Sequence, residues 1–173
     1  MMNLIALAAR PGWLVLIGVA WAIVFGLILV TVGQISDVSG GSGILDFEVG
    51  YSVETVAKIL GSYGVEGLRL YQRVQMLDLL NPALYSLLLA GVSYLLWRGS
   101  GRERLAHLAF LGGLGDYLEN VTLLLIVADF PEIDGSLIGI SSALSLIKNG
   151  LLVVAVAPLV AGLGRKALSR RGQ

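Results

Sequence analysis

Residues 105–128 read LAHLAFLGGLGDYLENVTLLLIVA, an apolar stretch interrupted near its middle by Asp116, Glu119 and Asn120. As an α-helix it is long enough to cross a hydrocarbon core about 30 Å thick, which needs roughly 20 residues. Spacings of three and four residues place the three polar side chains on one helix face. An ionisable side chain at the bilayer centre costs roughly 3 kcal/mol, so such groups normally face a partner or a cavity. The stretch therefore predicts a membrane-spanning helix with a polar face turned into a helix bundle.

The composition of the whole chain is that of a membrane protein. Its 173 residues are 56% hydrophobic and only 14% charged, which is too apolar for an ordinary soluble domain. Four stretches are long enough to cross a membrane, namely residues 11–33, 76–97, 105–128 and 137–163. Because lipid offers no hydrogen bonds to the backbone, these spans must be helices. We expect one all-α membrane domain over residues 1–173, built as a four-transmembrane-helix bundle.

Basic residues gather at one end of the predicted spans. Eight of the twelve lysines and arginines lie before the first span, between the second and third, or after the fourth. They are Arg10, Arg98, Arg102, Arg104, Arg165, Lys166, Arg170 and Arg171. Because cytoplasmic loops are enriched in basic residues, we expect a multi-pass protein of the cell membrane with both termini in the cytoplasm.

The longest segment outside the spans covers residues 34–75, which this orientation places on the extracytoplasmic side. Serine and glycine at residues 39–43 predict a loop. From Val53 the apolar residues recur at helical spacing, and Ser52 and Glu54 are typical of a helix start. We expect a short amphipathic helix here, folded over the outer mouth of the bundle. A second helix is expected to begin near Val65 and to continue without a break into the second span.

Polar side chains on two other helices match the polar face of the third span. The fourth span carries one polar stripe, on which Lys148 lies at about the depth of the acids. The stripe consists of Ser141, Ser142, Ser145, Lys148 and Asn149. The second span and the helix before it carry a third stripe, formed by Tyr71, Asp78, Asn81 and Tyr85. Together the three stripes predict a polar pocket inside the bundle, open toward the first loop.

Two kinds of role can be assigned to the residues of this pocket. The carboxylates Glu119, Asp116 and Asp78 are the candidate catalytic groups, because a carboxyl group in a low-dielectric pocket is suited to proton transfer. The candidate ligand-binding residues are Asn120, Lys148, Asn149, Ser145, Asn81, Tyr85 and Tyr71. A network that only fixes the register of the helices would use the same residues.

The residue types exclude several classes of function. Without cysteine there can be no disulfide, no thiolate metal site and no thiol nucleophile, and the single histidine leaves little scope for an imidazole site. We therefore expect no cofactor and no metal. The twelve basic residues are balanced by twelve acidic ones, and no basic domain is present, so nucleic acid is not an expected partner.

Binding of a lipophilic small molecule or lipid with a polar head is the function that this pattern favours most. If the protein is an enzyme, the carboxylates favour non-redox acid–base chemistry of the isomerase, cyclase or hydrolase type on an isoprenoid or lipid. Two other functions fit the same residues. One is an accessory or assembly subunit, which would dock on a larger membrane complex or on further copies of this chain. The other is a component of a proton-coupled transporter or channel.

Overall fold

A computed structural model of the chain describes residues 1–132 and 134–171, and no β-strand occurs in these residues. In chain order its elements are α1 (Met2–Ala8), α2 (Pro11–Ser39), η1 (Leu45–Phe47), α3 (Val53–Ser62), α4 (Gly64–Asp78), α5 (Asn81–Trp97), η2 (Glu103–Leu108), α6 (Ala109–Asp129) and α7 (Gly135–Arg171). The segments Pro11–Ser39, Gly64–Trp97, Glu103–Asp129 and Gly135–Leu168 are each long and apolar enough to cross a membrane. The prediction of an all-α chain with four such helices is confirmed.

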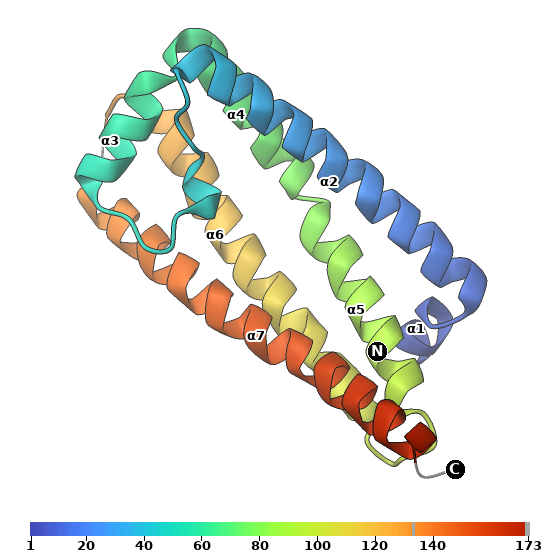
Figure 1. Ribbon diagram of the computed structural model, residues 1–173. Coiled ribbons are helices and arrows are strands. Elements are labelled where there is room, and N and C mark those ends of the chain that lie inside the picture. Colours follow the sequence, from blue (N-terminus) through green and yellow to red (C-terminus); the bar gives the residue numbers. More distant parts are fainter. Residues whose placement is uncertain (133, 172–173) are drawn as a thin grey trace.

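The long helices form two packed groups that meet along the bundle. Helix α2 packs against α4 and α5, while α6 packs against α7 and α5. In Figure 1 the segment that contains η1 and α3 lies between these groups at one end of the bundle. Helix α1 and the C-terminal part of α7 lie at the opposite end. The first loop and the chain ends are therefore at opposite ends of the molecule.

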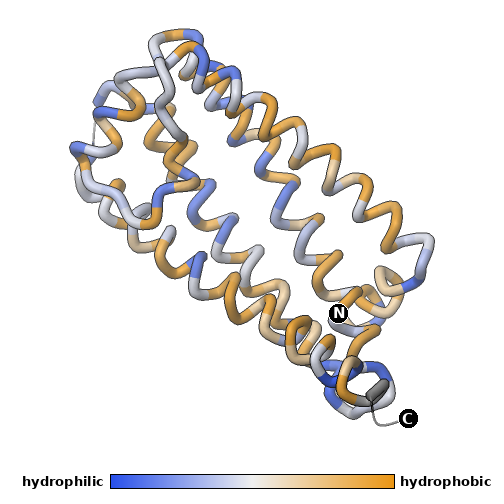
Figure 2. The backbone as a smooth tube through the Cα atoms, in the orientation of Figure 1, coloured by the Kyte–Doolittle hydropathy of each residue, from blue (hydrophilic) through white to orange (hydrophobic). Residues whose placement is uncertain are grey.

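Apolar side chains cover the outer surface of the long helices. Val15 and Val30 on α2 are 67% and 63% exposed, and Val153 and Val160 on α7 are 71% and 65% exposed. Figure 2 shows this apolar character along most of the helices, with hydrophilic positions in the half of the bundle that carries the first loop and again at the opposite tip. Such a continuous apolar surface suits contact with lipid rather than water.

The second predicted span is broken, so the expectation of one unbroken helix is wrong. Helix α4 ends at Asp78 and α5 begins at Asn81, and Figure 1 shows the interruption between them. Pro82 lies in the first turn of α5. Because proline has no N–H, it cannot bond the carbonyl oxygen of Asp78, four residues earlier. The break therefore frees a carbonyl group inside the bundle.

The first loop folds back into the bundle instead of staying in solvent. Ile44 and Leu45 are fully buried and belong to one apolar cluster with residues of α2, α4, α6 and α7. Gly40 and Gly50, with φ angles of 69° and 76°, allow the chain to turn on either side of this insertion. Helix α3 follows, and the Ser52 hydroxyl accepts a hydrogen bond from the N–H of Thr55 at its start. This fold carries η1 to the polar centre of the bundle.

Candidate functional site

An ion pair between α6 and α7 forms the core of the site. The Lys148 ammonium group contacts the Glu119 carboxylate directly and lies 3.6 Å from Oδ1 of Asp116. Glu119 is 0% exposed, and Lys148 and Asp116 are 8% and 7% exposed. Close packing of the helices supports this contact, because a Cβ atom on Gly115 would lie only 3.1 Å from the Lys148 Cα atom. The structure thus joins the two predicted polar stripes through a buried, charged contact.

A second polar centre surrounds the break between α4 and α5. The Asp78 carboxylate accepts hydrogen bonds from Asn81 Nδ2 at 2.9 Å and from Asn120 Nδ2 at 2.8 Å. The Asn120 amide also donates to the freed Asp78 carbonyl oxygen at 3.3 Å, and the Tyr117 hydroxyl donates to the Leu79 carbonyl oxygen at 2.9 Å. Side chains of α6 therefore satisfy the backbone groups that the break exposes.

A third carboxylate, Asp46, comes from the first loop. Its oxygens accept hydrogen bonds from the Tyr71 hydroxyl at 2.6 Å and from Gln75 Nε2 at 2.8 Å and 3.0 Å. Sequence reasoning missed Asp46, which lies in the long segment between the first and second predicted spans. The apolar neighbours Ile44, Leu45 and Phe47 are the signal that could have found it, since they are unusual in a solvated loop. Asp46 extends the site across α4.

These three groups enclose a small cavity of about 110 Å³. Its polar lining consists of Asp46, Asp78, Asp116, Lys148 and Asn81. Its apolar lining consists of Phe25, Ile28, Ile44, Phe47 and Val74. We call this space the polar cavity. The first loop lines one side of the polar cavity with Ile44, Asp46 and Phe47. Helix α2 lines another side with the apolar residues Phe25 and Ile28.

An apolar cleft of about 350 Å³ adjoins the polar cavity. The two spaces share Phe25, Asn81 and Asp116 as lining residues, so they meet at these side chains. The remaining lining of the cleft is Trp21, Tyr85, Leu88, Leu89 and Leu152. The Trp21 Nε1–H group donates to Asn81 Oδ1 at 3.0 Å and joins α2 to α5 at the junction. A polar space and an apolar space thus adjoin at these side chains.

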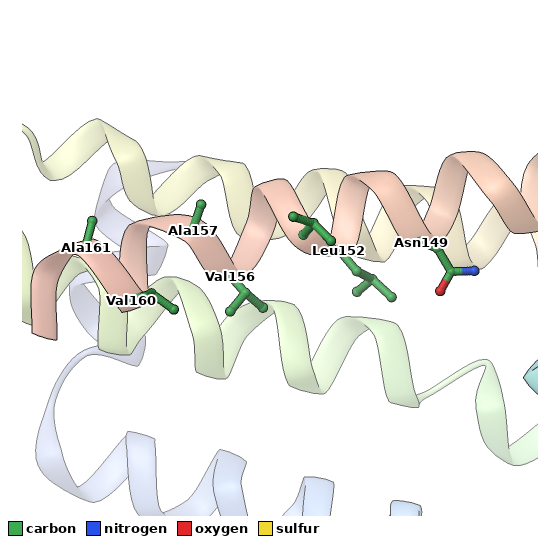
Figure 3. Close-up of a pocket in the computed structure, with 7 residues that line it drawn as sticks. Asn149, Leu152, Val156, Ala157, Val160 and Ala161 are labelled. Carbon is green, nitrogen blue, oxygen red and sulfur yellow. The ribbon is translucent and has the colours of Figure 1, made fainter. Parts of the chain in front are cut away.

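An open groove along α7 lies next to the cleft. Leu152 lines both spaces, and the groove continues over Val153, Val156, Ala157, Val160 and Ala161. Figure 3 shows these side chains along one stretch of α7, with Asn149 at its end. At a rise of 1.5 Å per residue, the groove extends over roughly 18 Å. Its size and apolar lining suit a hydrocarbon chain.

The remaining predicted residues lie around the site in different roles. The Ser145 hydroxyl donates to the Glu48 carbonyl oxygen at 3.0 Å and holds the first loop against α7. The Asn149 amide donates to the Ser145 carbonyl oxygen at 2.8 Å within the same helix, and Asn149 lines the α7 groove instead of the polar cavity. The Tyr71 hydroxyl donates to the Asp46 carboxylate.

Glu119 contacts Lys148 and does not line the polar cavity. Asp116 and Asp78 do line it, so these two carboxylates are better placed than Glu119 to contact a ligand in the cavity.

A chain of hydroxyl groups closes the end of the site nearest the first loop. The Tyr51 hydroxyl lies 2.5 Å from Ser141 Oγ, which also accepts a hydrogen bond from Thr122 Oγ1 at 2.7 Å. Burial raises the pKa of Tyr51 above its usual value, so this phenol stays neutral. The Thr122 hydroxyl also lies 2.8 Å from the Glu119 carbonyl oxygen, a second acceptor for its single proton. Ser141 belongs to the predicted polar stripe of the fourth span. Tyr51 and Thr122 were not predicted, because single hydroxyl groups in apolar stretches carry no distinctive pattern.

The described residues form an all-helical chain with four helices able to span a membrane. Its polar cavity adjoins an apolar cleft. Among the residues that the structure describes, no three His, Cys, Asp or Glu side chains are grouped so that they could hold a metal ion. No protein-family model, no curated protein and no solved structure matches the chain.

Proposed function

We propose that this protein binds a lipophilic small molecule or lipid, with the polar head in the polar cavity and the hydrocarbon part in the apolar cleft and the α7 groove. The observation that carries the proposal is the shared lining of the two spaces by Phe25, Asn81 and Asp116. Ligand sites are typically apolar with a few converging polar groups, as found here. A network that only fixed helix register would need no adjoining apolar cleft.

Any chemical step would use the carboxylates that line the cavity. Asp116 and Asp78 face the space that a polar head would occupy, whereas Glu119 holds Lys148. A general acid or base must reach the reacting atom within hydrogen-bonding distance. We therefore assign proton transfer, in the isomerase, cyclase or hydrolase class, to Asp116 and Asp78, and keep Glu119 as the residue that positions Lys148.

Asp116→Asn is expected to lower the amount of bound lipophilic molecule by about tenfold, because it removes the charged group shared by the cavity and the cleft. The measurement is mass spectrometry of the protein extracted from its membrane directly into lipid nanodiscs. Asp129→Asn is the matched control, since Asp129 is on the same helix but exposed at its end. An Asp116→Asn protein that retains the same molecule at the wild-type level would contradict the proposal.

We further propose that the protein lies in the cell membrane with both chain ends in the cytoplasm. The basic residues Arg10, Arg98 and Arg165 support this orientation, and α1 and the C-terminal part of α7 lie at the same end of the bundle. Arg170 and Arg171, which the charge argument also used, have side chains outside the described residues. A fluorescent protein that folds only in the cytoplasm is expected to fluoresce when fused to the C-terminus. The same fusion to alkaline phosphatase, which is active only outside, is expected to be inactive, and the reverse pattern would refute the orientation.

A further inference from the structure

We infer that the polar cavity recognises a protonated amine, so that the ligand is a lipophilic amine. This inference rests on the proposed function and narrows it to one class of head group. Its basis is the distribution of charge and of hydrogen-bond acceptors around the cavity, together with the size of the cavity.

The charge around the cavity is unbalanced. The cavity is lined by the carboxyl groups Asp46, Asp78 and Asp116 and by one ammonium group, Lys148. Lys148 also contacts the buried carboxylate of Glu119, which lies behind the cavity wall. One basic group therefore faces four acidic groups. A second cation in the cavity would reduce this imbalance, whereas a phosphate or carboxylate head group would increase it.

The hydrogen bonds of the lining show where a donor is missing. Among the residues that the structure describes, only neutral groups donate to Asp46 and Asp78, namely a phenol and side-chain amides. Two of these donors, the amides of Gln75 and Asn120, are 0% exposed and do not themselves line the cavity. A protonated primary amine brings three donors and no acceptor.

The dimensions of the cavity fit a small cationic group. Its volume of about 110 Å³ is a few times the roughly 30 Å³ that a water molecule occupies in the liquid. The rings of Phe25 and Phe47 belong to the lining, and aromatic faces attract cations. Phe25 also lines the cleft, where the first methylene groups of the ligand would lie.

The test compares three probes of equal chain length: dodecylamine, dodecanol and dodecanoate. The purified full-length protein is placed in nanodiscs of phosphatidylcholine at pH 7, where an aliphatic amine is protonated. Binding is followed by the fluorescence of Trp21, which lines the cleft, and empty nanodiscs give the background. A variant with Trp13 and Trp97 replaced by Phe isolates the Trp21 signal. Dodecylamine is expected to bind at least about tenfold more tightly than dodecanol, and dodecanoate more weakly than both.

Variants separate recognition of the head group from binding of the chain. Asp116→Asn and Asp46→Asn are each expected to weaken the binding of dodecylamine, so that the preference for amine over alcohol falls to about threefold or less. Asp46→Asn keeps the test decisive if Asp116→Asn does not fold, because Asp46 belongs to the first loop rather than to a span. The exposed Asp129→Asn is expected to keep the full preference.

The outcomes distinguish this inference from the proposed function on which it rests. Equal binding of the amine and the alcohol would overturn the inference and leave binding of a lipophilic molecule in place. Tightest binding of dodecanoate would also overturn it and would identify Lys148 as the head-group partner. Failure of all three probes to bind would refute the amine inference and count against the proposed function itself.

Discussion

Lys148→Met is expected to lower the free energy of unfolding by about 3–5 kcal/mol, because it leaves the buried Glu119 carboxylate without its partner. Glu119 is 0% exposed, and the lysine is the only basic group with which it forms an ion pair among the described residues. Asp116 loses the same partner. The measurement is reversible unfolding in mixed detergent micelles with increasing sodium dodecyl sulfate, followed by circular dichroism. Lys58→Met, on the exposed face of α3, is expected to unfold at the wild-type midpoint.

The double variant Lys148→Met with Glu119→Gln tests the physical reason for this loss. If the destabilisation comes from an unpaired buried carboxylate, neutralising Glu119 should restore roughly 1–3 kcal/mol of it. If it comes from lost packing of the lysine side chain, Glu119→Gln should restore nothing. A Lys148→Met protein as stable as the wild type would show that Glu119 carries no charge in the folded state.

The sequence predicted the parts of the site that lie on the long helices. Lys148 meets Glu119 and Asp116 because helix periodicity and rise place all three at one depth on facing stripes. Asn120 and Asp78 also come together, at the Pro82 break, although helix depth alone did not pair them. These positions could be derived because a helix in lipid has few ways to bury a polar face.

The contribution of the first loop could not be derived in this way. Asp46 enters the cavity through a short turn bounded by glycines, and such a turn has no periodicity from which the direction of a side chain could be read. Tyr71 and Ser145 belong to predicted stripes, yet they hold Asp46 and the Glu48 backbone instead of facing the cavity. The roles of Tyr71 and Ser145 are decided by the packing of the first loop against α4 and α7, which involves residues far apart in the sequence.

The break between α4 and α5 contributes to both the fold and the site. A continuous helix would have used the Asp78 carbonyl oxygen within its own backbone, and Asn120 would have had no reason to reach it. Because Pro82 frees this oxygen, Asn120 binds both the carbonyl and the carboxylate of Asp78. These two hydrogen bonds hold Asp78 in position, and Asp78 lines the polar cavity. The stability of the break and the shape of the site therefore depend on the same amide.

Asn120→Leu should accordingly destabilise the fold by about 3 kcal/mol and also reduce ligand binding. The substitution keeps a side chain of similar size but leaves the buried Asp78 carboxylate and carbonyl oxygen without the Asn120 donor. Tyr117→Phe removes only the hydrogen bond to the Leu79 carbonyl oxygen at the same break, and should cost about 1 kcal/mol. Detergent unfolding measures the first effect, and mass spectrometry of the bound molecule measures the second.

The matched control for Asn120→Leu is Asn149→Leu. Asn149 lies at a comparable depth on α7, but its amide bonds only a carbonyl oxygen of its own helix, which already lies within the helical backbone. An apolar side chain suits its place in the α7 groove, so its replacement should leave stability nearly unchanged. Equal losses for the two variants would mean that any amide in the bundle contributes alike and that the break has no special role. A loss confined to Asn120→Leu, with ligand binding reduced in parallel, would show that the broken helix holds Asp78 in place for the ligand.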